Sequence, residues 1–228
     1  MFRPKKNGLF HPYSTGKEGT NIFGFDRKGT RSHTTIGILG CTPGCGVTHL
    51  AIALGSYCSS KSRKSTAFLE FHTRNEISGL LPENRLAEFE ENSSQRPHFK
   101  LQGMDYYPCV KSNEIPALMN RRYDYLILDM GSLGEADLSE FLRCDRKLVL
   151  GSLAPWKAES YQTFFHSFQS ISNLGEGFTF LTQTGNTKDV REFSKTNHIS
   201  VRSVPFIQNP FRIEKQLFLF LDELLTER

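Results

Sequence analysis

Short apolar runs of strand length alternate along this chain with longer segments of helical pattern. The strand-like runs occupy residues 35–39, 66–71, 125–130, 147–153, 178–182 and 201–204. A further extended stretch is expected at residues 98–107, with a bend at Gly103. Strands that alternate with helices at this spacing predict a mainly parallel sheet with helices on both faces. The ligands of such sheets bind at the carboxyl ends of the strands.

The helical segments fall between and after these runs, at residues 48–61, 155–173 and 211–228, with a mostly polar and partly helical one within 77–91. The first is predicted to be amphipathic. Pro155 suits the first turn of the second helix, and Gly175 follows its end where a helix cap is expected. Aromatic residues near helical spacing in this segment are predicted to pack in the core: Trp156, Tyr161, Phe164, Phe165 and Phe168.

The last segment, residues 211–228, has the pattern of a strongly apolar helix. Its polar positions carry four acidic residues and three basic ones, whereas anionic lipid favours a helix with a basic face. We therefore expect this helix to cap the sheet rather than to bind a membrane.

Length and composition suit one α/β domain with a tail. The chain has 228 residues and a mass of 26.0 kDa. No apolar run reaches the roughly 18–20 residues that are needed to cross a bilayer. The five cysteines are scattered and odd in number, which argues against a disulfide framework and favours a reducing, cytoplasmic location.

The formal charge of +4 is unevenly distributed along the chain. Residues 1–32 hold seven basic residues and two acidic ones, a charge of about +5, so the remainder is close to −1. Because this region is rich in glycine, threonine and serine and lacks apolar periodicity, we interpret residues 1–33 as a flexible basic leader and residues 34–228 as the folded domain. A basic arm could contact nucleic acid or a membrane, but dispersed charges favour a solvated tail.

A glycine-rich loop, residues 41–48 with the sequence CTPGCGVT, joins the first strand to the first helix. The backbone N–H groups of such a turn and the N-terminus of the following helix form a concave anion site. The P-loop pattern GxxxxGK[ST] adds a lysine for the β- and γ-phosphates and a hydroxyl for Mg²⁺. Gly44, Gly46 and Thr48 stand at the required spacing, but Val47 stands at the lysine position. The alternative is a turn that needs glycine for its backbone angles alone.

Three residues of this region have alternative interpretations. Cys41 and Cys45 could bind a metal or form a redox pair, but no second Cys/His pair of zinc spacing accompanies them. Small residues that fit the loop are therefore favoured. His49 could contact a phosphate, although an ordinary position in the first helical turn is favoured.

From Thr34 to its end, the chain resembles the MinD/ParA family of P-loop ATPases, whose loop reads GKGGVGKT. Thr42 stands where the family has its signature lysine, which reaches across a dimer, and Val47 replaces the in-loop lysine. The segment TAFLEFH resembles the family's second strand, with Glu70 and His72 at the positions of its Asp-x-Asp pair.

Three further segments resemble the family in the same order. YDYLILDMGS is similar to the Walker B strand, with Asp129 at the Mg²⁺-linked acid. CDRKLVLGSLAPW resembles a later strand with its following helix, and VPFIQNPF, which contains Pro205, resembles the proline-containing loop near the adenine. The resemblance implies a P-loop NTPase fold, a three-layer α/β/α sandwich with a mainly parallel sheet.

The resemblance also implies ATP or ADP with Mg²⁺ as the cofactor. It places the nucleotide at Thr42, Pro43, Gly44, Cys45, Gly46, Val47, Thr48, His49 and Pro205, and the Mg²⁺ at Thr48 and Asp129. A homodimer and an unidentified protein partner are the expected assemblies.

The missing lysines weaken the expected chemistry. Loss of one charge-assisted contact costs about 1.5–3 kcal/mol of binding, which is roughly ten- to a hundredfold in affinity. Hydrolysis should suffer more, because positive charge must meet the charge that develops in the transition state. His72 is also a poor match for the carboxylate that positions water in the family. We expect weak nucleotide binding with little or no turnover.

One branch of the family, the CpaE/TadZ proteins of Flp-type (tad) pilus and secretion systems, also loses the in-loop lysine. Its GVGAT is similar to Gly46-Val47-Thr48 in having no cation at that place. Because these proteins act chiefly as localisation factors, the leading hypothesis is a pseudo-ATPase that positions or assembles such machinery. One alternative is a slow but genuine ATPase whose cation comes from elsewhere, for instance Arg31, Arg74 or a partner. The other is an interaction module that no longer binds nucleotide.

Overall fold

The computed structural model describes residues 33–62, 64–81, 98–157, 159–169 and 177–226. The chain divides into Met1–Thr30 and Arg31–Arg228, and everything described below belongs to the second part. Nearly all of the predicted basic leader and the predicted helical stretch beyond residue 81 lie outside the described residues.

An eight-stranded sheet forms the centre of the fold, in the order β3-β4-β2-β5-β1-β6-β7-β8. The strands are β1 (Thr34–Gly40), β2 (Thr66–Glu70), β3 (Phe99–Leu101), β4 (Met104–Tyr107), β5 (Tyr125–Ser132), β6 (Arg146–Gly151), β7 (Thr179–Thr182) and β8 (Val201–Ser203). All neighbours pair in parallel except β3 and β4, which are antiparallel around a turn at Gly103. Each predicted strand and the predicted bend are thus confirmed, and β1 lies inside the sheet between β5 and β6.

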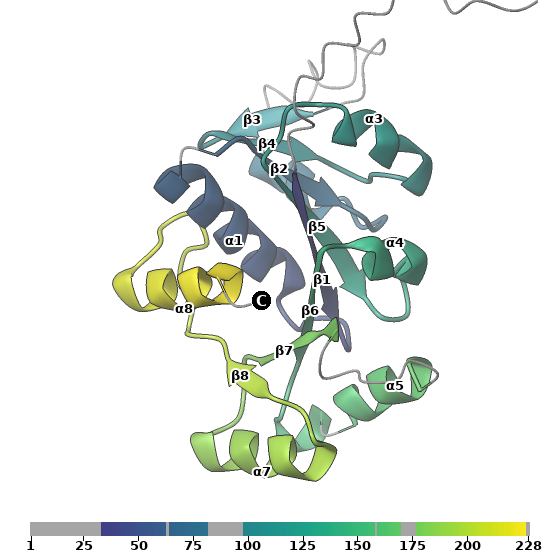
Figure 1. The fold of residues 1–228 in the computed structure, drawn as a ribbon, viewed down its shortest axis with the longest axis vertical. Coiled ribbons are helices and arrows are strands. Elements are labelled where there is room, and N and C mark those ends of the chain that lie inside the picture. Colours follow the sequence, from purple (N-terminus) through teal and green to yellow (C-terminus); the bar gives the residue numbers. More distant parts are fainter. Residues whose placement is uncertain (1–32, 63, 82–97, 158, 170–176, 227–228) are drawn as a thin grey trace, which may run out of the picture. The chain divides into compact units, whose positions relative to one another are not determined.

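Helices cover both faces of the sheet (Figure 1). They are α1 (Val47–Ser62), α3 (Ile115–Met119), α4 (Leu138–Arg143), α5 (Ser160–Ser167), α7 (Thr187–Asn197) and α8 (Lys215–Thr226), with 3₁₀ turns η1 (Glu76–Leu80), η2 (Ser112–Glu114) and η3 (Pro155–Lys157). α1 and α8 lie on one face, and α3, α4 and α5 lie on the other. Each face has its own apolar core. The predicted three-layer α/β/α architecture is confirmed.

The helix after the glycine loop, α1, is not amphipathic as predicted. Nearly every side chain from Val47 to Cys58 is buried or half-buried, because α8 packs alongside α1 on the side away from the sheet (Figure 1). The Tyr57 hydroxyl donates a 2.6 Å hydrogen bond to Asp222 across this contact. The predicted terminal helix is present as α8, and its apolar face belongs to the same core as α1.

The helix predicted at residues 155–173 begins later than expected, and its predicted end, with the cap at Gly175, lies outside the described residues. The chain first makes the separate 3₁₀ turn η3 and begins a regular helix only at Ser160. Tyr161, Phe164 and Phe168 pack in the core as predicted, and Phe165 is half-buried. Trp156, however, is 82% exposed. Its prediction as a core residue is wrong because η3 is out of phase with the buried face of α5.

Gly151 provides a test of the packing at the end of β6. A Cβ atom at this position would lie 2.4 Å from Cζ of Tyr161, whose fully buried ring is held because its hydroxyl donates to the Leu181 carbonyl oxygen. We expect Gly151→Ala to lower the free energy of unfolding by about 1–3 kcal/mol through overpacking. Urea unfolding measures this change.

The matched control is Gly134→Ala. A Cβ atom at Gly134 would meet nothing within 4 Å, so this variant should unfold within about 0.5 kcal/mol of the wild type. Equal stabilities of the two variants would contradict the packing described for Gly151.

A candidate phosphate-binding site at the carboxyl edge of the sheet

The glycine loop forms a concave cradle between β1 and α1. Gly44 and Gly46 have φ angles of 73° and 82°, in the left-handed region where glycine is favoured. A Cβ atom on Gly46 would lie 2.4 Å from the Gln183 side-chain nitrogen, but this exposed side chain can move, so the requirement for glycine rests on the φ angle. The cradle opens into a cavity of about 300 Å³, lined by residues 42–49 with Ile52, Arg74, Glu76, Gly131 and Ser132.

Pro205 lies outside this cavity. It lines a neighbouring one of about 340 Å³ together with residues 206–209 and the start of α8. His49 links the two regions, because its Nε2 lies 2.8 Å from the Ile207 carbonyl oxygen. A carbonyl oxygen only accepts, so Nε2 carries the proton and donates it. The loop residues from the sequence analysis are thus brought together around one cavity, and Pro205 is attached to it through His49.

The two positions where the related loops carry lysine hold small side chains here. Val47 is only 6% exposed and packs against the base of the loop, where its Cγ2 would lie 2.9 Å from a Cβ atom on Gly40. The Thr42 hydroxyl lies 3.2 Å from Sγ of Cys45, within the loop itself. Burial raises the pKa of the Cys41 thiol, and no group of metal-binding side chains occurs among the described residues. The loop therefore supplies backbone N–H groups but no charged side chain.

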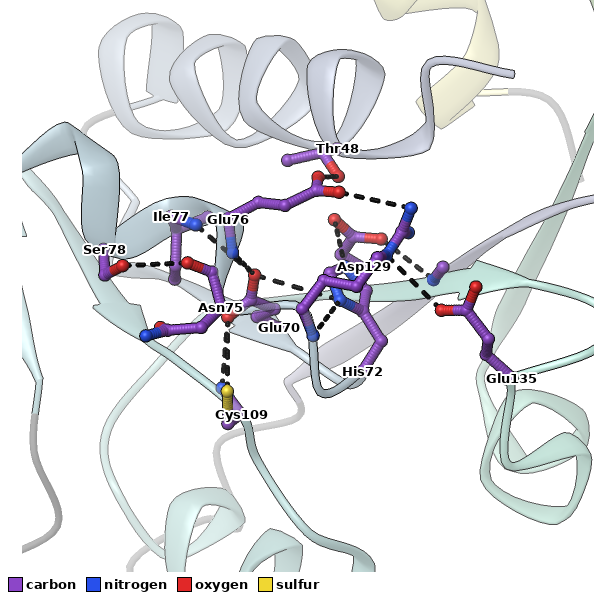
Figure 2. Close-up of polar contacts among 12 residues, drawn as sticks. Thr48, Glu70, His72, Asn75, Glu76, Ile77, Ser78, Cys109, Asp129 and Glu135 are labelled. Carbon is purple, nitrogen blue, oxygen red and sulfur yellow. Dashed lines mark hydrogen bonds and ion pairs between the residues drawn. The ribbon is translucent and has the colours of Figure 1, made fainter. Parts of the chain in front are cut away.

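Glu70, at the end of β2, is fully buried and acts on the backbone rather than on the cavity. Its Oε1 accepts from the backbone N–H groups of Glu76 at 2.6 Å and Ile77 at 3.3 Å, and its Oε2 accepts from Cys109 at 3.2 Å (Figure 2). Asn75, within the turn that these bonds close, has a φ of 52°. Glu70 thus fixes the shape of the turn that follows β2.

His72 lies in this turn, buried between two carboxylates (Figure 2). Its Nε2 is 3.4 Å from Oδ2 of Asp129, and its Nδ1 is 3.9 Å from Oε1 of Glu70. Burial lowers the pKa of His72, but Asp129 and Glu70 raise it by more, so the pKa lies above its ordinary value. Gly131 makes room for the ring, since a Cβ atom there would lie 3.1 Å from Cδ2 of His72.

Asp129 and Thr48 lie at the same edge of the sheet, with Thr48 at the start of α1 facing the strand that carries Asp129 (Figure 2). Oδ1 of Asp129 accepts from the Gly131 N–H at 3.0 Å, whereas Oδ2 is buried without a hydrogen bond in the described part of the chain. A hydroxyl and a carboxylate are ligands of the kind that Mg²⁺ prefers. The free Oδ2 fits this ion, although the neighbouring imidazole competes with it for the same oxygen.

Two ion pairs and a hydrogen bond cross the mouth of the cradle, and the sequence did not predict them. The Thr48 hydroxyl donates to Oε2 of Glu76 at 3.1 Å. Arg74 lies 3.2 Å from the other oxygen of Glu76 and 3.4 Å from Oε2 of Glu135. Of the two arginines that the sequence offers as an alternative cation, Arg74 lies at this site and Arg31 lies outside the described residues. The Thr48–Glu76 hydrogen bond joins residues 28 positions apart, and no sequence motif marks it or the Arg74–Glu135 pair.

No protein-family model and no curated protein matches this sequence. Solved structures do match it over most of its length. MinD from Aquifex aeolicus, also solved as a MinC:MinD complex, is 14% identical with a TM-score of 0.64 and covers 86% of this chain and 98% of its own. A plasmid partition protein from Borrelia burgdorferi is 14% identical with a TM-score of 0.55, covering 85% and 96%.

A third match extends the comparison to a biosynthetic enzyme. Cobyrinic acid a,c-diamide synthase from Mycobacterium smegmatis, solved with bound ADP and magnesium, is 12% identical with a TM-score of 0.58 and covers 85% of this chain and 94% of its own. At these identities the comparisons establish the fold. The chain has the α/β fold of MinD/ParA-type P-loop NTPases.

The buried His72 makes stability depend on pH. Because its pKa is raised in the folded protein, the stabilisation is fully present below the ordinary histidine value of about 6.5 and is lost as pH rises through the folded value. As the pH increases through this range, we expect the free energy of unfolding of the wild type to decrease more than that of His72→Gln. Urea unfolding from pH 6 to pH 9 measures the difference.

His166→Gln, on the exposed side of α5, controls for the loss of an imidazole as such. A difference between wild type and His72→Gln that stays constant with pH would show that His72 is not charged in the folded protein.

Proposed function

We propose that this protein is a MinD/ParA-like nucleotide-binding protein that acts as a localisation or assembly factor, binding ATP or ADP weakly and hydrolysing ATP little or not at all. One observation carries the proposal. The loop keeps the left-handed glycines of a phosphate cradle at Gly44 and Gly46, while Val47 and Thr42 fill the lysine positions with uncharged side chains.

The binding part rests on the backbone. Successive N–H groups of residues 44–48 and the N-terminus of the 16-residue helix α1 favour an anion. The synthase with the same fold was solved with ADP and magnesium. Thr48 and Asp129 would hold Mg²⁺ here, and the ion would neutralise charge on the phosphates. The Pro205 loop, anchored to His49 through Ile207, would lie near the adenine.

The proposal of weak turnover rests on Glu70 and His72, which stand at the positions of the family's Asp-x-Asp pair. Glu70 is fully buried, holds backbone N–H groups with both carboxylate oxygens and does not line the cavity, so it is poorly placed to direct water there. His72 is buried and held beside Asp129. Hydrolysis needs a positioned water and positive charge at the transition state together, and the loop residues offer neither.

The localisation part rests on partners. MinD of the same fold was solved in complex with MinC, a second protein. The lysine-free Gly46-Val47-Thr48 resembles the CpaE/TadZ loop, so we propose that the protein helps to position or assemble a Flp/tad-type pilus or secretion system. A homodimer or a protein partner is part of the proposal.

No helix among the described residues is long and apolar enough to cross a membrane. A cytoplasmic location is part of the proposal.

Nucleotide titration tests this function. We expect calorimetry of the full chain to detect ATP and ADP binding that tightens with Mg²⁺, and phosphate release to stay near the level of buffer alone. Robust hydrolysis by the purified protein would contradict the proposed role and favour a genuine ATPase.

The discriminating variant is Val47→Lys, which restores the in-loop lysine. It should tighten ATP binding by about 1–3 kcal/mol, because an ammonium at the cradle gains a charge-assisted contact with phosphate. Turnover should rise less, since Thr42 and His72 are unchanged. An unchanged affinity in Val47→Lys would indicate that the loop does not hold phosphate.

A further inference from the structure

Arg74 is the only arginine or lysine among the described residues that line the cavity of the glycine loop. It stands in the turn after β2, three residues before the buried Ile77, and Glu70 fixes the backbone of that turn. The charge that the loop lacks is therefore present at the mouth of the cradle, on a different element.

Arg74 is held by two carboxylates that do not belong to the loop. Its Nη1 lies 3.2 Å from Oε1 of Glu76, and its Nε lies 3.4 Å from Oε2 of Glu135. The three side chains are 36%, 41% and 38% exposed. Ion pairs this exposed are weak, so the guanidinium can exchange a carboxylate for a stronger anion.

Glu76 lines the cavity beside the start of α1. Its Oε2 accepts from the Thr48 hydroxyl, at the second residue of α1, while its other oxygen faces Arg74. A carboxylate near a helix N-terminus is stabilised by the same partial charge that would attract a phosphate. The Glu76 carboxylate thus lies between the Arg74 guanidinium and the Thr48 hydroxyl in the first turn of α1.

We propose that Arg74 binds the terminal phosphate of the nucleotide in place of the missing lysines, and that Glu76 keeps the cradle closed until phosphate displaces its carboxylate. This inference rests on the nucleotide binding proposed above. It adds the residue that supplies the positive charge and the residue that opposes binding.

The exchange is favourable for a polyphosphate in particular. A terminal phosphate carries more negative charge than a carboxylate, and guanidinium binds phosphate oxygens in a bidentate, charge-assisted manner. Because Glu76 already bridges Thr48 and Arg74, a phosphate in its place would meet both groups without a change in the turn. The Glu70 hydrogen bonds keep the backbone of the turn in place during the exchange.

Calorimetry of the full chain with ATP and with inorganic triphosphate, each with Mg²⁺ and with EDTA, tests the proposal. Arg74→Gln should weaken both ligands by about 10- to 100-fold. Glu76→Gln should tighten both by about two- to fivefold, because it removes an anion from the helix N-terminus and releases Arg74. Arg143→Gln is the matched control, since Arg143 also pairs with an acid, Glu140 at 2.6 Å, on α4; it should bind like the wild type.

Each of the other outcomes would contradict one specific part of the proposal. If Arg74→Gln binds like the wild type, or loses affinity for ATP but not for triphosphate, Arg74 is not the phosphate-binding cation, while the proposed function stands. If Glu76→Gln binds no more tightly than the wild type, Glu76 does not close the cradle. If neither the wild type nor Glu76→Gln binds ATP at millimolar concentration, this inference and the proposed nucleotide binding both fail.

Discussion

The buried carboxylate of Glu70 is the interaction on which the rest of the site depends. A charge taken out of water is costly unless it is hydrogen-bonded, and Glu70 meets this requirement with backbone N–H groups of Glu76, Ile77 and Cys109. These bonds fold the turn after β2 so that His72 points under Asp129 and Glu76 reaches Thr48 (Figure 2). Glu70 thus acts as a structural acceptor for the backbone of this turn.

A second feature of the site is that its positive charge lies outside the glycine loop. The usual loop carries its cations on the P-loop itself, where they are fixed against the phosphates. In this chain the loop is uncharged, and the turn after β2 carries both a histidine with a raised pKa and an arginine in exposed ion pairs. A cation held by exchangeable carboxylates supports ligand-dependent rearrangement better than steady turnover. This arrangement fits a factor that responds to nucleotide, and it links the proposed weak hydrolysis to the proposed role of Arg74.

Sequence reasoning was sufficient for the sheet and insufficient for the site. The strands were predictable because each apolar run is buried between two helical layers, and the glycine loop because its spacing is local. α7 was missed because it is mostly polar: none of its residues is fully buried, and Val190 and Phe193 are only partly buried against the core. Trp156 was placed wrongly because a 3₁₀ turn interrupts the helical phase at η3. The Thr48–Glu76 and Arg74–Glu135 contacts join distant segments, and only the fold brings these together.

The most direct test of this account is a crystal structure of the protein with a non-hydrolysable ATP analogue. The account predicts phosphates along the backbone of residues 44–48, the Arg74 guanidinium about 3 Å from the terminal phosphate, and Glu76 turned away from Thr48. An analogue bound elsewhere, or bound in the loop with Arg74 still paired to Glu76 and Glu135, would contradict it.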